Sequence, residues 1–195
     1  MKIDFRSITT GACIVLVAAN LAACGKDPYA GKPMQSQENV AVEAAAPAPG
    51  PQFDVAKESS EQVLAMKPVQ TCALENVAAL VDNLPRPGAA PNSWSVGKGQ
   101  AYRLIGFASN RDAGAVPATF RLVLVGAKVY ALAAATGAAR PDVAAYFKTP
   151  AFAKAGYQAD AAFDRVDAGE YRVFALQGAG AETLACPTYQ RVTVK

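Results

Sequence analysis

Residues 120–133 read FRLVLVGAKVYALA, two apolar runs on either side of Gly126-Ala127. Both runs alternate with a period of two, which is typical of strands because successive side chains point to opposite faces of a sheet. Glycine suits the first central position of a type II′ turn, so we predict a hairpin with a two-residue turn. On the face that we expect to be the core, this register makes three pairs: Leu124 with Val129, Leu122 with Ala131, and Phe120 with Ala133.

Further strand-like segments surround this hairpin and are separated by turns rich in glycine and proline. They are residues 74–81 (alternatively a short helix), 100–108, 157–163, 170–176, 182–186 and 189–194. One short helix is expected over residues 141–147, because Pro141 fits its first position and Asp142 favours its positive end. About seven short strands with one helical insertion predict an all-β fold, a β-sandwich over residues 68–195.

The first 24 residues have the pattern of an export signal. Lys2 and Arg6 precede an apolar run at residues 8–19, which is too short to span a bilayer. Leu21-Ala22-Ala23-Cys24 follows and resembles the bacterial lipobox. That resemblance implies a signal peptide over residues 1–23, lipid on Cys24 and anchoring in a membrane of the cell envelope. With Gly25 after the cysteine, it favours the outer membrane, facing the periplasm.

Residues 24–67 are predicted to be a tether. Five prolines lie between Pro28 and Pro51, and large apolar side chains are nearly absent, so no core can form there. A short helix is expected within residues 54–67, with Asp54 as its N-cap and Pro68 as its stop.

The cysteines fit an exported protein. Cys13 leaves with the signal and Cys24 carries lipid, which leaves Cys72 and Cys186 in an oxidising compartment. A disulfide between these two is the simplest interpretation. The alternative is a metal pair, which is weak because the chain contains no histidine and two thiols do not complete a tetrahedral site.

Four segments together resemble a β-sandwich unit that recurs in bacterial envelope proteins. They are Ala101 to Ala108, the run Arg140-Pro141-Asp142-Val143 continuing to Phe147, the step Ala155-Gly156-Tyr157, and the run from Ala168 to Val173. The resemblance implies an immunoglobulin-like accessory domain that is not a catalyst, and it names no ligand.

Composition and motifs exclude several classes of function. The formal charge of +3 becomes +2 without residues 1–23, which carry Lys2, Arg6 and Asp4, so nucleic acid is not an expected partner. Without histidine there is no Ser–His–Asp system and no His-ligated metal, and we expect neither a cofactor nor an enzyme. The densest carboxylates are Asp160, Asp164, Asp167 and Glu170. We interpret them as turn formers, with a loose calcium site or paired acid–base catalysis as alternatives.

Three side chains are candidate binding residues. Arg140 and Asp142 could face a partner, or could serve the fold by pairing with a strand carboxylate and capping the helix. Trp94 could stack on a sugar, or could be a buried anchor. The tyrosines at 102, 130, 171 and 189 are expected to be packing residues. The leading functional hypothesis is a tethered module for an envelope protein partner; the alternatives are a glycan-binding module and, disfavoured, a small carboxylate-dependent hydrolase.

Overall fold

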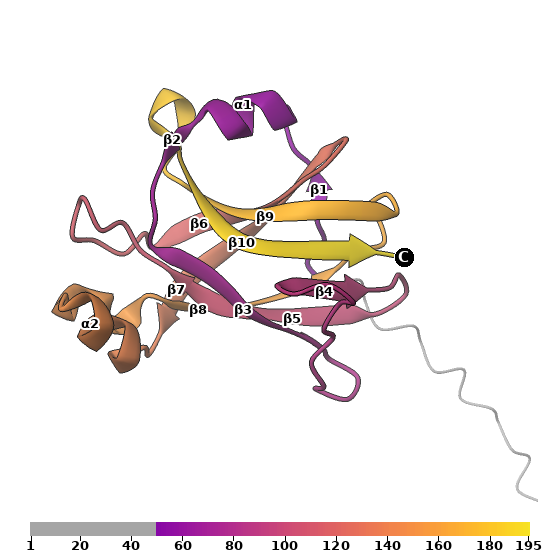
Figure 1. Ribbon diagram of the computed structural model, residues 1–195, viewed down its shortest axis with the longest axis horizontal. Coiled ribbons are helices and arrows are strands. Elements are labelled where there is room, and N and C mark those ends of the chain that lie inside the picture. Colours follow the sequence, from indigo (N-terminus) through magenta and orange to yellow (C-terminus); the bar gives the residue numbers. More distant parts are fainter. Residues whose placement is uncertain (1–49) are drawn as a thin grey trace, which may run out of the picture. The chain divides into compact units, whose positions relative to one another are not determined.

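The computed structural model describes residues 50–195, so the predicted signal peptide, Cys24 and most of the predicted tether lie outside it. Strand is the predominant secondary structure of the described chain (Figure 1), in agreement with the all-β prediction. The elements are β1 (Asp54–Val55), α1 (Ser60–Ala65), β2 (Lys67–Pro68), β3 (Cys72–Ala79), β4 (Ser93–Val96), β5 (Ala101–Ala108), β6 (Thr119–Val125), β7 (Val129–Ala138), α2 (Pro141–Phe147), η1 (Pro150–Lys154), β8 (Gly156–Ala162), β9 (Gly169–Gln177), η2 (Gly180–Glu182) and β10 (Leu184–Val194).

The strands form one continuous, curled sheet. Its order is β2-β10-β9-β6-β7-β8-β5-β3, with β1 on β7 and β4 on β10. Strand β7 joins the two halves of this sheet, because residues 129–135 pair with β6 whereas Thr136 and Ala138 pair with β8. Gly137 has φ +135 and lies between Thr136 and Ala138, where the register of β7 with β8 shifts. A glycine and an irregular register are the usual means of bending a strand around a corner.

The open side of the curl, between β3 and β10, is bridged in two ways. The predicted disulfide is present: Cys72 on β3 is bonded to Cys186 on β10, with their Cα atoms 6.2 Å apart. Elsewhere along the gap, the amide of Arg86 donates to Val77 on β3, and the amide of Ser95 on β4 donates to Arg86. Strand β4 in turn runs parallel to β10. Hydrogen bonds therefore pass from β3 to β10 through an added segment.

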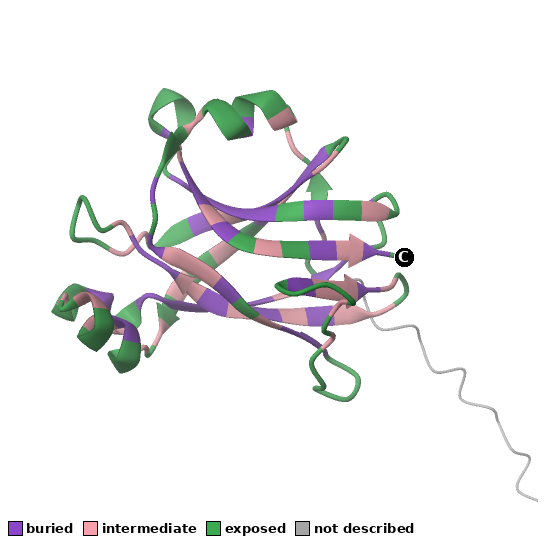
Figure 2. Cartoon of the chain, in the orientation of Figure 1, coloured by how far each residue is buried: buried purple, intermediate pink, exposed green. Residues whose placement is uncertain are grey.

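The core lies inside the curl, and it follows from strand alternation. Along β5, every second residue is buried, starting at Tyr102 and Leu104. Figure 2 shows the same alternation of buried and partly exposed bands on the long strands. The largest fully buried side chains include Leu122, Tyr130 and Tyr157. Burying such side chains is the main favourable contribution to folding.

The predicted hairpin exists, but its register is wrong by one residue. Three residues, 126–128, connect the strands, so Leu124 pairs with Tyr130 rather than with Val129. Gly126 does not adopt the positive φ that a type II′ turn requires. Glycine is needed at position 126 because the backbone there lies close to the Tyr171 ring: a Cβ would be 2.7 Å from it.

The folded unit begins earlier than residue 68. Phe53 is fully buried, and its ring centroid lies 5.0 Å from that of Phe163. The expected helix is shorter than predicted, and Asp54 is not its cap: Ser59 accepts from the Gln62 amide, and its own amide donates to the Gln62 side chain. This reciprocal pair is a capping box. Val63 then packs on the outer face of the sheet, so residues 53–67 act as a strap over it.

Other segments follow the prediction more closely. The first predicted strand is β3, not the alternative helix, and residues 141–147 form α2 with Pro141 at its start. The last two predicted strands are one irregular strand, β10, and the segment around Trp94 forms an additional strand, β4.

Candidate functional site

Helix α2 and the short helix η1 form an insertion between β7 and β8, at the left of Figure 1. The insertion has a small core of its own, in which Val143, Phe152 and Ala155 are buried. Lys148 ends α2 in the left-handed conformation (φ +53), and its amide donates back to the last turn. The helix therefore has a defined position on the sheet.

Arg140 holds this insertion to β3. Its Nη1 and Nη2 atoms donate to the two carboxylate oxygens of Glu75, at 2.6 and 2.9 Å. Its Nε and Nη2 donate to Asp142, at 2.9 and 2.7 Å. The guanidinium also lies 5.3 Å from the centroid of the Phe107 ring. Charge-assisted, bidentate pairs of this kind fix geometry better than single contacts do.

We call Arg140 with its two partners, Glu75 and Asp142, the clamp. Its hydrogen bonds shift the pKa values of Arg140 and Asp142. The hydrogen bond from Arg140 lowers the pKa of Asp142 to about 2. Bonding to Asp142 and Glu75 raises the pKa of Arg140 above its usual value, so the guanidinium stays charged. Asp142 makes no side-chain cap on α2. The structure thus places Arg140 and Asp142 together, with both charges already satisfied within the chain.

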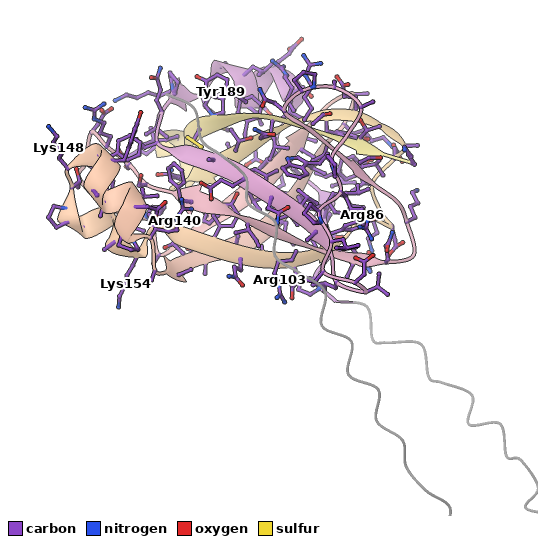
Figure 3. The ribbon with its side chains drawn as sticks, turned by 60° about the horizontal axis from the view of Figure 1, so that its bottom comes forward. Arg86, Arg103, Arg140, Lys148, Lys154 and Tyr189 are labelled. Carbon is purple, nitrogen blue, oxygen red and sulfur yellow. A yellow bond between two sulfur atoms is a disulfide. The ribbon has the colours of Figure 1, made fainter. Side chains whose placement is uncertain are left out.

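Helix α2 presents one large aromatic side chain, Tyr146, to solvent. Tyr146 is 81% exposed and stands edge-on to Phe147, with their ring centroids 4.9 Å apart. Phe147 in turn contacts Phe107 and Phe152. A shallow depression of about 320 Å³ lies here, lined by Phe107, Arg140, Asp142, Val143, Tyr146 and Phe147. We call these six residues the α2 face; Figure 3 shows Arg140 within this region and Lys148 and Lys154 beside it.

Trp94 lies elsewhere, on β4, which Figure 1 shows across the molecule from α2. Its ring is partly buried and packs against the main core. Its indole N–H is buried with no acceptor within residues 50–195. Nothing brings Trp94 together with Arg140 and Asp142.

The four clustered carboxylates each have a separate partner. Asp160 pairs with Arg103, Asp167 with Lys128 and Glu170 with Arg191, while Asp164 accepts from the Gly99 amide. Bonding to Arg103 and to Lys128 lowers the pKa of Asp160 and of Asp167, respectively. Over residues 50–195, no group of three or more His, Cys, Asp or Glu side chains could hold a metal ion.

The sequence did not indicate Glu75, Phe107 or Tyr146 as residues of this site, and the expected role of one tyrosine was wrong. Glu75 and Phe107 lie on strands far from α2 in the sequence, so only the fold brings them to Arg140. Tyr146 was predictable only as one residue of a short helix. Tyr102, Tyr130 and Tyr171 are buried as expected, but Tyr189 is 71% exposed.

Comparison of the chain with protein-family models, with curated proteins and with solved structures gave no match. Within the described residues, neither helix has the length and apolar character needed to cross a membrane.

Proposed function

We propose that this protein is a non-enzymatic, lipid-anchored protein of the bacterial envelope whose immunoglobulin-like domain binds a protein partner through the α2 face. The proposed localisation rests on the sequence Leu21-Ala22-Ala23-Cys24, which resembles a lipobox. A diacylglyceryl thioether and an N-acyl chain on Cys24 would hold the mature chain at a membrane, because each buried CH₂ contributes about 0.8 kcal/mol.

Strand order supports the immunoglobulin-like part of the proposal. In that fold, strands A, B, E and D make one layer, and C, F and G make the other. Here the run β3-β5-β8-β7 has the order A-B-E-D and the run β6-β9-β10 has the order C-F-G, and β6 also pairs with β7, so the two runs are joined in one sheet. Assigned in chain order, the seven long strands fit A to G.

Tyr171 gives independent support. It lies near the start of β9, the strand that would be F, and its hydroxyl donates to the carbonyl of Asp167 at 2.8 Å. A tyrosine that bonds back to the backbone at this corner is a hallmark of the immunoglobulin fold.

The glycines within the segments of resemblance have structural roles. At Gly106, a Cβ would lie 2.0 Å from the Ala73 carbonyl oxygen and 2.7 Å from the Tyr157 hydroxyl. At Gly156, it would lie 2.8 Å from Cγ of Arg140. These residues are needed to assemble the sheet and to place Arg140 beside it.

The exposed Tyr146 on a clamped helix is the observation that carries the binding part of the proposal. Tyrosine and arginine dominate the energetic centres of protein interfaces, and a rigid platform loses little entropy on binding. Arg140 holds the platform and Tyr146 is free to contact a partner. Tethering near a membrane raises the effective concentration, so a weak contact is sufficient.

In-cell crosslinking tests this proposal. A photoreactive phenylalanine analogue replaces Tyr146 in the full-length protein, and Leu64 on α1, which is 48% exposed, is replaced in the matched control. We expect one dominant crosslinked protein from position 146 that is absent from position 64. Identical products from both positions, or none from position 146, would contradict the proposal.

A second arm tests the clamp and the anchor. Arg140→Met keeps the photoreactive residue at position 146 but removes the hydrogen bonds that hold α2 to β3. The yield of the same crosslink should therefore fall. Cys24→Ala should release the protein from the membrane fraction, and mass spectrometry of the wild-type mature N-terminus should find acyl chains on Cys24.

A further inference from the structure

Strand β10 carries a wide bulge near its middle. Pro187 pairs with Phe174 and Arg191 pairs with Arg172, so the three residues 188–190 lie opposite the single residue Val173. The hydroxyl of Thr188 donates to the Val173 carbonyl and holds the bulge in place. Bulges redirect side chains and are frequent beside functional sites.

The bulge puts Tyr189 into an unfavourable conformation. Its φ is +59, in the left-handed region, which costs an aromatic residue about 1–2 kcal/mol. Its side chain gains no burial in return, because it is 71% exposed. Strain at an exposed side chain without a packing benefit points to a role in binding.

A pair of arginines lies beside this tyrosine. Arg172 and Arg191 are directly opposite each other on adjacent strands, and like charges in that position repel. Arg191 is compensated by Glu170 at 3.1 Å. Arg172 takes part in none of the ion pairs of residues 50–195; its guanidinium lies 5.8 Å from the Phe174 ring centroid.

These side chains line one concavity of about 270 Å³, formed by Arg172, Val173, Phe174, Pro187, Tyr189, Gln190 and Arg191. We call it the bulge groove; Figure 3 labels Tyr189, one of its residues. It contains an exposed aromatic ring, an uncompensated guanidinium and a side-chain amide.

We infer that the bulge groove binds a carboxylate-bearing saccharide. The Tyr189 ring would stack on the apolar face of a sugar ring, Arg172 would bind the carboxylate in a bidentate manner, and the Gln190 amide would bind hydroxyl groups. The anion would also relieve the repulsion between Arg172 and Arg191. This inference goes beyond the proposed protein contact and uses a different surface from the α2 face.

Other anions fit the groove less well. A bare inorganic anion has no apolar face that could stack on the exposed ring of Tyr189. An acidic peptide commonly adds to a free strand edge, but the edge of β10 away from β9 is paired with β2 at residues 184–185 and with β4 at residues 191–194, which leaves only the irregular residues 186–190 open. A ring with a carboxylate uses all three groups.

Calorimetric titration of the full-length protein in detergent tests this inference. The probe is tetragalacturonate, an oligosaccharide with one carboxylate per sugar, and its control ligand is the methyl ester, which has the same rings without the charge. We expect the ester to bind about tenfold more weakly or worse, because it loses the charged hydrogen bond. Binding of the acid should also weaken with added salt.

Variants locate the site. Arg172→Gln and Tyr189→Asn should each reduce affinity for tetragalacturonate about tenfold, while Lys148→Gln, which removes a cation near the α2 face, should leave it unchanged. Thermal unfolding shows that each variant is folded. Four outcomes would overturn the inference: no binding by the wild-type protein, equal binding of acid and ester, undiminished binding by Arg172→Gln, or equally tight binding of poly-glutamate.

Discussion

The guanidinium of Arg140 donates hydrogen bonds to two carboxylates from different parts of the chain, Glu75 and Asp142, which compensate its charge within the protein. The lowered pKa of Asp142, about 2 against an ordinary 3.8, records the same bond. A sequence pattern can propose Arg140 and Asp142 as polar residues of interest, but not how their charges are used. That depends on Glu75, which only the folding of β3 brings near.

The Asp142 bond predicts a pH dependence of stability. Since its pKa is lower in the folded state, the unfolded chain binds more protons between about pH 4 and pH 2, and the pair's contribution is lost as the pH falls through that window. Urea unfolding at a series of pH values should show a shallower loss for Asp142→Asn than for wild type. The control is Asp112→Asn, because Asp112 is in none of the ion pairs of residues 50–195. Parallel curves for wild type and Asp142→Asn would refute this assignment.

Tyr189 gives a second prediction at the residue scale, in which stability and binding change in opposite directions. Asparagine tolerates the left-handed conformation, so Tyr189→Asn should raise the free energy of unfolding by about 0.5–1 kcal/mol while it weakens saccharide binding. Chemical denaturation measures the first effect. A loss of stability would mean that Tyr189 is a packing residue after all.

At the scale of elements, Gly106 on β5 shows how closely the strands approach. A Cβ there would meet a carbonyl oxygen of β3, so Gly106→Ala should destabilise the protein by about 3 kcal/mol. Tyr157→Phe removes only the hydrogen bond to Ala73, at a cost of about 1 kcal/mol. Because the backbone contact remains, the double variant should be no more stable than Gly106→Ala; recovery in the double variant would show that the tyrosine, not the backbone, sets the limit.

Trp94 on β4 separates packing from sugar binding. Its partly buried ring lies against the main core, so Trp94→Ala should lower the free energy of unfolding by about 2–3 kcal/mol. Trp94→Phe should retain most of that stability. Retention of the folded Trp94→Phe variant on acidic glycan should be unchanged, because the bulge groove does not include this residue. A loss of retention without loss of stability would restore Trp94 as a binding residue.

The elements also show where pattern reading succeeds and fails. Alternation located β5, β6 and β9 to within a residue or two, and Pro141 marked the start of α2. The hairpin register failed at β7, which is apolar on both faces beside the turn: Tyr130 and Leu132, not the expected Ala131, point into the main core, whereas Val129 lies under α1. With both faces buried, alternation cannot select one, and a slip of one residue goes unnoticed. The strap was missed because only two of its side chains, Phe53 and Val63, are buried, which is too few to form a pattern.

At the scale of the whole molecule, the two edges of a curled sheet meet across the gap between β3 and β10, and the disulfide is the covalent link there. It closes a loop with a sequence separation of 114 residues. In the chain-entropy model, such a loop gives about 4–5 kcal/mol by restricting the unfolded chain. Cys72→Ala/Cys186→Ala should therefore lower the free energy of unfolding by up to that amount. The fold itself should persist, because the backbone hydrogen bonds of Arg86 and the β4 ladder still bridge the edges. Urea unfolding of the wild type with and without reductant, beside the double variant, measures this. If reduction leaves the unfolding midpoint unchanged, the hydrogen-bonded bridges alone keep the sheet curled.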